Sequence, residues 1–118
     1  MKIINLTPHA LNVRGAYGSG DLTNPDSGIH ITPSGEVARV TVQNSLADTA
    51  NGIPVFHQIV GHVYDLPKPQ SGVVFITSAM VRLAVPARTD VLSPGELIRN
   101  GDGQPVGCYG LIGNGGDQ

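Results

Sequence analysis

The chain has 118 residues, a formal net charge of −2 and only 14% charged side chains. Its seven lysines and arginines are scattered and form no basic block, which disfavours nonspecific binding to duplex nucleic acid, because such binding needs several cations on one face. The single cysteine excludes an intrachain disulfide, and no apolar run is long enough to cross a membrane.

The composition favours one domain that spans residues 1–118. Sixteen glycines and nine prolines predict short elements and many turns, and 40% hydrophobic residues suffice for a modest core. We therefore expect an α+β fold that is mainly β, with a small sheet, one short helix and a C-terminal hairpin. Met1–Asn5 lead straight into a strand-like segment and leave no room for the apolar part of a secretion signal, so we expect a cytoplasmic protein.

The first half of the chain predicts short strands separated by turns. A long glycine-rich loop is expected at residues 14–28, a tight turn at residues 32–35 and a polar turn-like stretch at residues 44–51. Asn51-Gly52 is a good hairpin turn, and Gly61 predicts a bulge in the strand that follows. The expected strands are residues 2–13 (broken at Thr7-Pro8-His9), 29–31, 36–43 and 53–64.

Residues 72–86 predict a buried strand that runs straight into a short helix. The apolar run after Gly72 suits a strand covered on both faces, Ser78 stands at the helix cap position, and Pro86 ends the helix. Such a junction presents unpaired backbone N–H groups and the positive end of a helix dipole, which together favour an anion.

The rest of the chain predicts two further β units. Residues 90–92 form a short strand, and residues 93–96 form a turn. Residues 97–99 and 106–109 then form a terminal hairpin around residues 100–103, with a frayed tail from Gly113 onward.

A right-handed crossover from the buried strand through the helix would bring several polar residues together. The carboxyl ends of neighbouring parallel strands form the crevice where open α/β sheets bind ligands. We therefore take five residues as candidates to hold a phosphate; the alternative is that the arginines, Arg88 included, are solvated surface charges. The candidates are His9, Thr77, Ser78, Arg82 and Arg99.

Other chemistry has weaker support in the sequence. The four histidines lack the close spacing of a structural zinc site, and Ser78 lacks the glycines of a nucleophile elbow. Cys108 lies in an expected strand and fits a small apolar core residue. We accordingly expect no metal, no cofactor and no catalytic set, although an enzyme remains an alternative.

Six segments of the chain resemble a family of small proteins encoded in bacteriophage and prophage genomes. The resemblance covers most of the chain apart from the loop at residues 15–28 and the tail, and it implies a genome context without implying catalytic residues. The segments are Leu6-Thr7-Pro8-His9, Pro33-Ser34-Gly35-Glu36-Val37-Ala38-Arg39-Val40, Asn51-Gly52-Ile53-Pro54-Val55, residues 72–85, Arg88-Thr89-Asp90-Val91-Leu92-Ser93-Pro94-Gly95 and Gly107-Cys108.

Small phage proteins outside the virion often block host defences, and one class of them sequesters nucleotide immune signals. By this analogy we expect a homo-oligomeric accessory protein of the host cytoplasm that sequesters a small phosphate-bearing ligand, such as a cyclic nucleotide or an ADP-ribose derivative. One alternative is a small nucleotide hydrolase with His9 or His62 as base. The other is a protein–protein inhibitor or minor structural protein that binds through residues 65–70 or exposed strands. The homo-oligomer is expected because Ile53, Val55 and Ile59 alternate with Phe56 and Val60, which makes both faces of one strand apolar.

Overall fold

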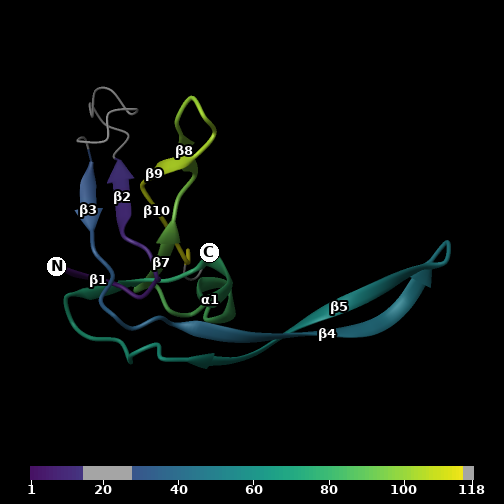
Figure 1. Ribbon diagram of the computed structural model, residues 1–118. Helices are drawn as coiled ribbons and strands as arrows, with labels where there is room; N and C mark the ends of the chain where they lie inside the picture. The colour runs from purple at the N-terminus through teal and green to yellow at the C-terminus, as the bar shows by residue number, and fades with distance from the viewer. Residues whose placement is uncertain (15–27, 116–118) are drawn as a thin grey trace.

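A computed structural model describes residues 1–14 and 28–115 (Figure 1). Within those ranges the chain forms ten strands and one short helix, which confirms the expected α+β, mainly β fold. The elements are β1 (Lys2–Asn5), β2 (Leu11–Arg14), β3 (Ile29–Ile31), β4 (Arg39–Ala50), β5 (Ile53–Tyr64), β6 (Val73–Ile76), α1 (Ala79–Ala84), β7 (Val91–Pro94), β8 (Leu97–Arg99), β9 (Pro105–Tyr109) and β10 (Leu111–Gly113).

The first sheet, sheet A, has the strand order β1-β6-β7-β10 and holds the core. β6 is central and parallel to both β1 and β7, whereas β10 is antiparallel to β7. The apolar run predicted a strand covered on both faces, and Phe75 and Ile76 are fully buried. Phe75 packs with Leu6, Ala38 and Val81 in the main apolar cluster.

Helix α1 follows β6 as expected and covers the core with Val81, its buried residue. Ser78 is the N-cap, and its side chain accepts a hydrogen bond of 3.3 Å from the backbone N–H of Val81. The helix ends before Pro86, because proline disfavours helical geometry in the residue that precedes it. The parallel pairing of β6 with β7 confirms the strand–helix–strand unit.

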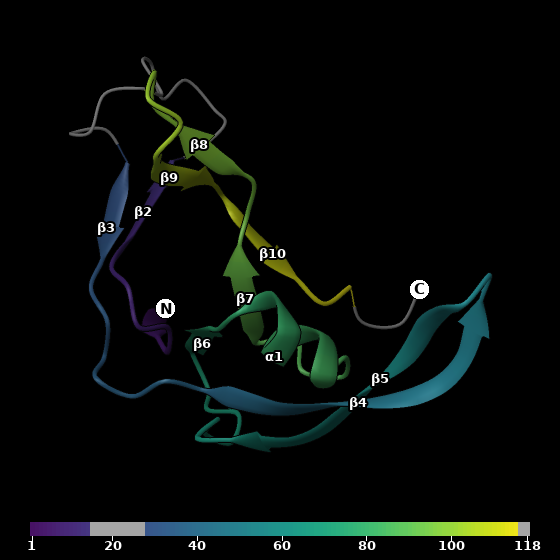
Figure 2. The same cartoon turned by 45° about the vertical axis from the view of Figure 1, so that its right-hand side comes forward.

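The second sheet, sheet B, has the order β3-β2-β9-β8 and contains the expected terminal hairpin, β8–β9. The side-chain oxygen of Asn100 closes its turn by accepting hydrogen bonds from the backbone N–H groups of Asp102 and Gln104. Strand β7 leads into β8 and strand β9 leads into β10, so the chain passes here from sheet A to sheet B and back again (Figure 2). The expected turn at residues 93–96 is shorter than predicted, because β7 continues to Pro94.

Strands β4 and β5 form a two-stranded arm that extends away from both sheets (Figure 1). Asn51 and Gly52 have φ values of 52° and 82°, the left-handed conformation that a two-residue hairpin turn requires. The expected bulge is confirmed, because Gly61 and His62 lie opposite Thr41 alone. The expected polar turn at residues 44–51 is wrong: β4 continues to Ala50, since pairing with β5 outweighs the polar composition.

The expected loop and the expected tail lie partly outside the described residues. Residues 15–27 of the loop and residues 116–118 of the tail are not among them. The tail is ordered further than expected: β10 pairs with β7, and the Asn114 amide donates to the carbonyls of Arg82, Val85 and Arg88. In residues 1–14 and 28–115, no helix has the length and apolar character needed to span a membrane.

Replacing Gly95 by alanine should destabilise the fold severely. The backbone N–H of Gly95 donates to the Gly110 carbonyl at 3.0 Å, and a Cβ at Gly95 would collide with the backbone carbonyl of Tyr109. Because backbone cannot move aside cheaply, we expect a loss of about 3 kcal/mol in the free energy of unfolding, measured by urea denaturation. Gly101→Ala is the matched control, since nothing lies within 4 Å of its added Cβ; an equal loss in both variants would contradict the prediction.

Arg88 and Asp90 form an ion pair that should make the free energy of unfolding depend on pH in the acid range. Two hydrogen bonds of 2.8 and 2.9 Å join them, and Arg88 also donates to the Pro67 carbonyl at 2.9 Å. The hydrogen bonds from Arg88 hold the pKa of Asp90 below its usual value. Asp90 therefore stabilises the fold fully above the ordinary carboxyl pKa, and this contribution disappears as pH falls through the lowered folded-state pKa.

Asp90→Asn should accordingly lower the free energy of unfolding at neutral pH by about 1.5 kcal/mol. The difference from the wild type should shrink as the pH falls through the folded-state pKa of Asp90. Urea denaturation of both proteins over an acid series measures it, with the exposed Asp102→Asn as control. A difference that stays constant down to the lowest pH would show that the carboxylate charge is not involved.

Candidate functional site

The strand–helix junction is built from Thr77 and Ser78, which use their polar atoms within the fold. Thr77 is fully buried; its hydroxyl donates to the Ser78 carbonyl and its N–H donates to the Leu92 carbonyl, both at 2.8 Å. The Ser78 hydroxyl caps α1. The helix has only six residues, so few backbone dipoles add up at this end.

Arg82 lies half-buried beside this junction and braces the C-terminal segment. Its Nε donates to the Ser93 hydroxyl at 2.9 Å, and its Nη1 donates to the Asn114 side-chain oxygen at 3.1 Å. The Asn114 amide in turn donates to three carbonyls at the end of α1 and just beyond it. We refer to Arg82, Ser93 and Asn114 as the Arg82 brace; its bonds make Arg82 primarily a structural residue.

Arg99 and His9 are placed apart from the junction. Arg99 lies in β8 of sheet B, is exposed, and donates from Nη1 to the Gly103 carbonyl of its own hairpin at 2.8 Å. His9 precedes β2, where its carbonyl accepts hydrogen bonds from the side chains of Asn5 and Thr7. The structure therefore brings together Thr77, Ser78 and Arg82, and it places the other two candidates elsewhere.

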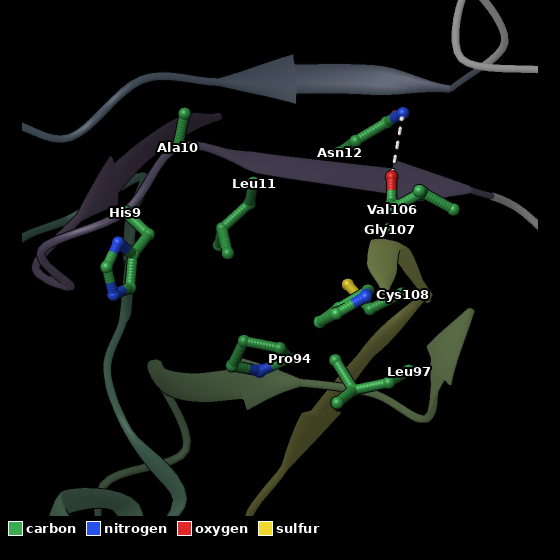
Figure 3. Close-up of a pocket in the computed structure, with 10 residues that line it drawn as sticks. His9, Ala10, Leu11, Asn12, Pro94, Leu97, Val106, Gly107 and Cys108 are labelled. Atoms are coloured by element: carbon green, nitrogen blue, oxygen red, sulfur yellow. Dashed lines mark hydrogen bonds between the residues drawn. The ribbon is translucent and has the colours of Figure 1, made fainter. Parts of the chain in front are cut away.

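An open cavity of about 420 Å³ lies where β2, the β8–β9 hairpin and the end of β7 meet (Figure 3). Its walls are mainly apolar, with Leu11 and Leu97 facing each other across the space in the close-up. The lining residues are His9, Ala10, Leu11, Asn12, Pro94, Leu97, Pro105, Val106, Gly107 and Cys108. A concave, mainly apolar site with a few polar groups is the usual form of a small-molecule site.

The cavity and the Arg82 brace are separate, although they touch the same strand. Successive residues of a strand project to opposite faces, so Ser93 directs its hydroxyl toward Arg82 while the next residue, Pro94, lines the cavity. Of the five candidate residues, only His9 lines the cavity. Arg99 lies next to it, because its strand partner in β9 is Pro105, which is part of the wall.

Cys108 lies in the cavity wall with its thiol buried. Burial raises the pKa of this thiol, and the S–H group donates to the Gly110 carbonyl at 3.6 Å. Both effects keep the sulfur protonated at neutral pH, which makes it a poor nucleophile. The structure thus agrees with the interpretation of Cys108 as a small apolar residue.

Metal chemistry has no cluster to support it in the part of the chain that the structure describes. Within residues 1–14 and 28–115, no group of three histidine, cysteine, aspartate or glutamate side chains could hold an ion. His62 lies on the arm and packs edge-on against Tyr64, with ring centroids 4.7 Å apart.

Comparison with protein-family models, curated proteins and solved structures gives no match.

The sequence did not predict the cavity, because its wall comes from three separate parts of the chain: residues 9–12, Pro94 with Leu97, and residues 105–108. No local pattern links these segments, and only the pairing of β2 with β9 brings the first and last together. The sequence signal that bears on the cavity is the pair of turn-forming sites Pro8-His9 and Pro94-Gly95, since both mark places where the chain changes direction.

Arg82 and Arg99 should differ sharply in their effect on stability. Arg82→Gln removes charge-assisted hydrogen bonds to Ser93 and Asn114, so the free energy of unfolding should fall by about 2 kcal/mol. Arg99→Gln changes an exposed side chain and should alter it by less than about 0.5 kcal/mol. Urea denaturation of the two variants measures the contrast, and similar losses in both would refute the structural role of the Arg82 brace.

Proposed function

We propose that this protein binds and sequesters a small phosphate-bearing ligand in the cavity at the meeting point of the two sheets. The observation that carries the proposal is the cavity itself, with its volume of about 420 Å³, its mainly apolar wall and its single imidazole. A nucleotide immune signal, such as a cyclic nucleotide or an ADP-ribose derivative, has the matching chemistry: a planar base and an anionic phosphate.

The apolar and polar parts of such a ligand have separate partners here. A base would pack on Leu11, Leu97 and Pro105, which removes apolar surface from water. A phosphate would lie at the rim, within reach of the His9 imidazole or of the exposed Arg99 guanidinium beside Pro105. Charge-assisted hydrogen bonds from these groups would give the ligand its orientation.

Binding without turnover has better support than hydrolysis. Among the described residues that line the cavity, none carries a carboxylate, and burial keeps the Cys108 thiol protonated. The hydrolase alternative needs a base, and of its two candidates only His9 lines the cavity, whereas His62 lies on the arm. The resemblance to phage proteins adds a reason to sequester a nucleotide signal in the host cytoplasm.

Calorimetric titration against cyclic dinucleotides and ADP-ribose derivatives tests the proposal. We expect one of them to bind and to be recovered intact after the protein is denatured, as judged by chromatography. Recovery of a cleaved product would establish the hydrolase instead. Absence of binding at high micromolar concentrations of every compound would refute nucleotide sequestration.

Variants at the cavity should separate its two parts. His9→Ala or Arg99→Gln, whichever removes the group that contacts the phosphate, should weaken binding about tenfold to a hundredfold through loss of charge-assisted contacts. Leu97→Trp should abolish binding by filling the cavity, whereas Leu83→Trp is the matched control, because Leu83 is an exposed leucine of α1 outside the wall. Equal binding by both tryptophan variants would place the ligand elsewhere.

A further inference from the structure

The arm formed by β4, β5 and the Asn51-Gly52 turn has no partner along most of its length. Its base is anchored, since Val40 and Val63 pack against the core, but all of residues 41–62 are exposed. Figures 1 and 2 show the arm reaching away from the sheets and the helix. A lone two-stranded hairpin is marginally stable in water, so its apolar side chains need a surface to cover them.

Leu46 and Phe56, two large apolar side chains of the arm, project from one of its faces; the other face also carries exposed apolar residues, Ile53 and Ile59 among them. Residues directly opposite each other in an antiparallel pair share a face, as do residues two positions apart on one strand. Leu46 and Phe56 are 63% and 57% exposed. The three cross-strand pairs of this face, which we call the Phe56 face, are Val42–Val60, Asn44–Gln58 and Leu46–Phe56.

The order of these pairs is symmetric in character: apolar, amide, apolar. The amide pair lies in the middle, roughly 7 Å along the strands from each apolar pair. A two-fold axis through this amide pair would place Leu46 and Phe56 of one copy on the smaller valine pair of the other. Large side chains would thus meet small ones, and amides, which both donate and accept, would meet amides.

Charge on the arm does not oppose such a contact. Between Arg39 and Asp65, Asp48 is the one formally charged residue of the sequence, and it lies beyond the Leu46–Phe56 pair. A face that docks on a strongly charged partner normally carries the opposite charge, whereas a face that meets its own copy must avoid like charges. The Phe56 face satisfies the second condition.

The exposed area is also larger than one compact chain requires. The accessible surface is 7871 Å², against about 6,100 Å² for a compact monomer of this mass. An arm that projects from the sheets exposes more area than a compact chain does (Figure 1).

We propose that the Phe56 face binds the same face of a second copy of this chain, with the two arms antiparallel across a two-fold axis at the Asn44–Gln58 pair. The contact is isologous, so one surface serves both copies and the assembly closes as a dimer. It does not depend on the ligand proposed for the cavity, because none of the residues of the Phe56 face lines the cavity.

Light scattering during size exclusion gives the first test. The wild type should have twice the 12.3 kDa mass of one chain. Phe56→Asp should raise the dimer dissociation constant roughly thirtyfold or more and shift the particle to a monomer. Ile59→Asp is the matched control, since Ile59 is a similarly exposed residue of β5 that pairs with Gln43 on the other face. A monomeric wild type at all concentrations, or a dimer lost only in Ile59→Asp, overturns the proposal.

A cysteine at the symmetry axis gives a test that does not depend on destabilising the arm. In the proposed dimer two copies of residue 58 lie close together, so Gln58→Cys should form an intermolecular disulfide under mild oxidation. Ser45→Cys, on the other face, should not, and buried Cys108 should not contribute. Cross-linking by Ser45→Cys in place of Gln58→Cys would show that the opposite face forms the contact.

Discussion

The close approach of backbone at Gly95 is the constraint on which the arrangement of the two sheets depends. There the chain leaves β7 of sheet A for β8 of sheet B, and it returns through Gly110 from β9 to β10. The two crossings touch, with the Gly95 N–H bonded to the Gly110 carbonyl and no space for a side chain at Gly95. Because β7 pairs with β10 on one side of this point and β8 pairs with β9 on the other, the Pro94, Leu97 and Cys108 parts of the cavity wall are brought to one place.

Local signals in the sequence predicted the local units of the fold. The apolar run into Ser78 indicated β6 and α1, Asn51-Gly52 indicated the arm's turn, and Gly61 indicated its bulge, and all three are confirmed. Each of these depends on neighbouring residues, such as the hydroxyl of a cap or a backbone with positive φ. The outer half of β4 was not predicted, since residues 44–50 are polar and become a strand only through their distant partner β5.

The candidate site could be predicted only in part for the same reason. The sequence indicated that residues after β6 and β7 would meet, and Arg82 does contact Ser93. It did not indicate that the Arg82 guanidinium would donate a hydrogen bond to the side chain of Asn114, which lies 32 positions further along the chain. Nor did it place His9 in a cavity wall together with β9, because the parallel pairing of β2 with β9 joins residues that lie 95 positions apart, such as Val13 and Cys108.

Sheet A has a consequence for how the protein is made. Its strands come from residues 2–5, 73–76, 91–94 and 111–113, so its first strand must wait for more than a hundred further residues before the sheet is complete. Contacts of such long separation in sequence close slowly, because the entropy of a large loop is lost before the sheet stabilises the chain. During synthesis the arm, whose two strands are joined by a two-residue turn, can pair long before the core that anchors it exists. The nascent chain therefore exposes an apolar hairpin early in synthesis, and such exposed apolar surface is what chaperones bind.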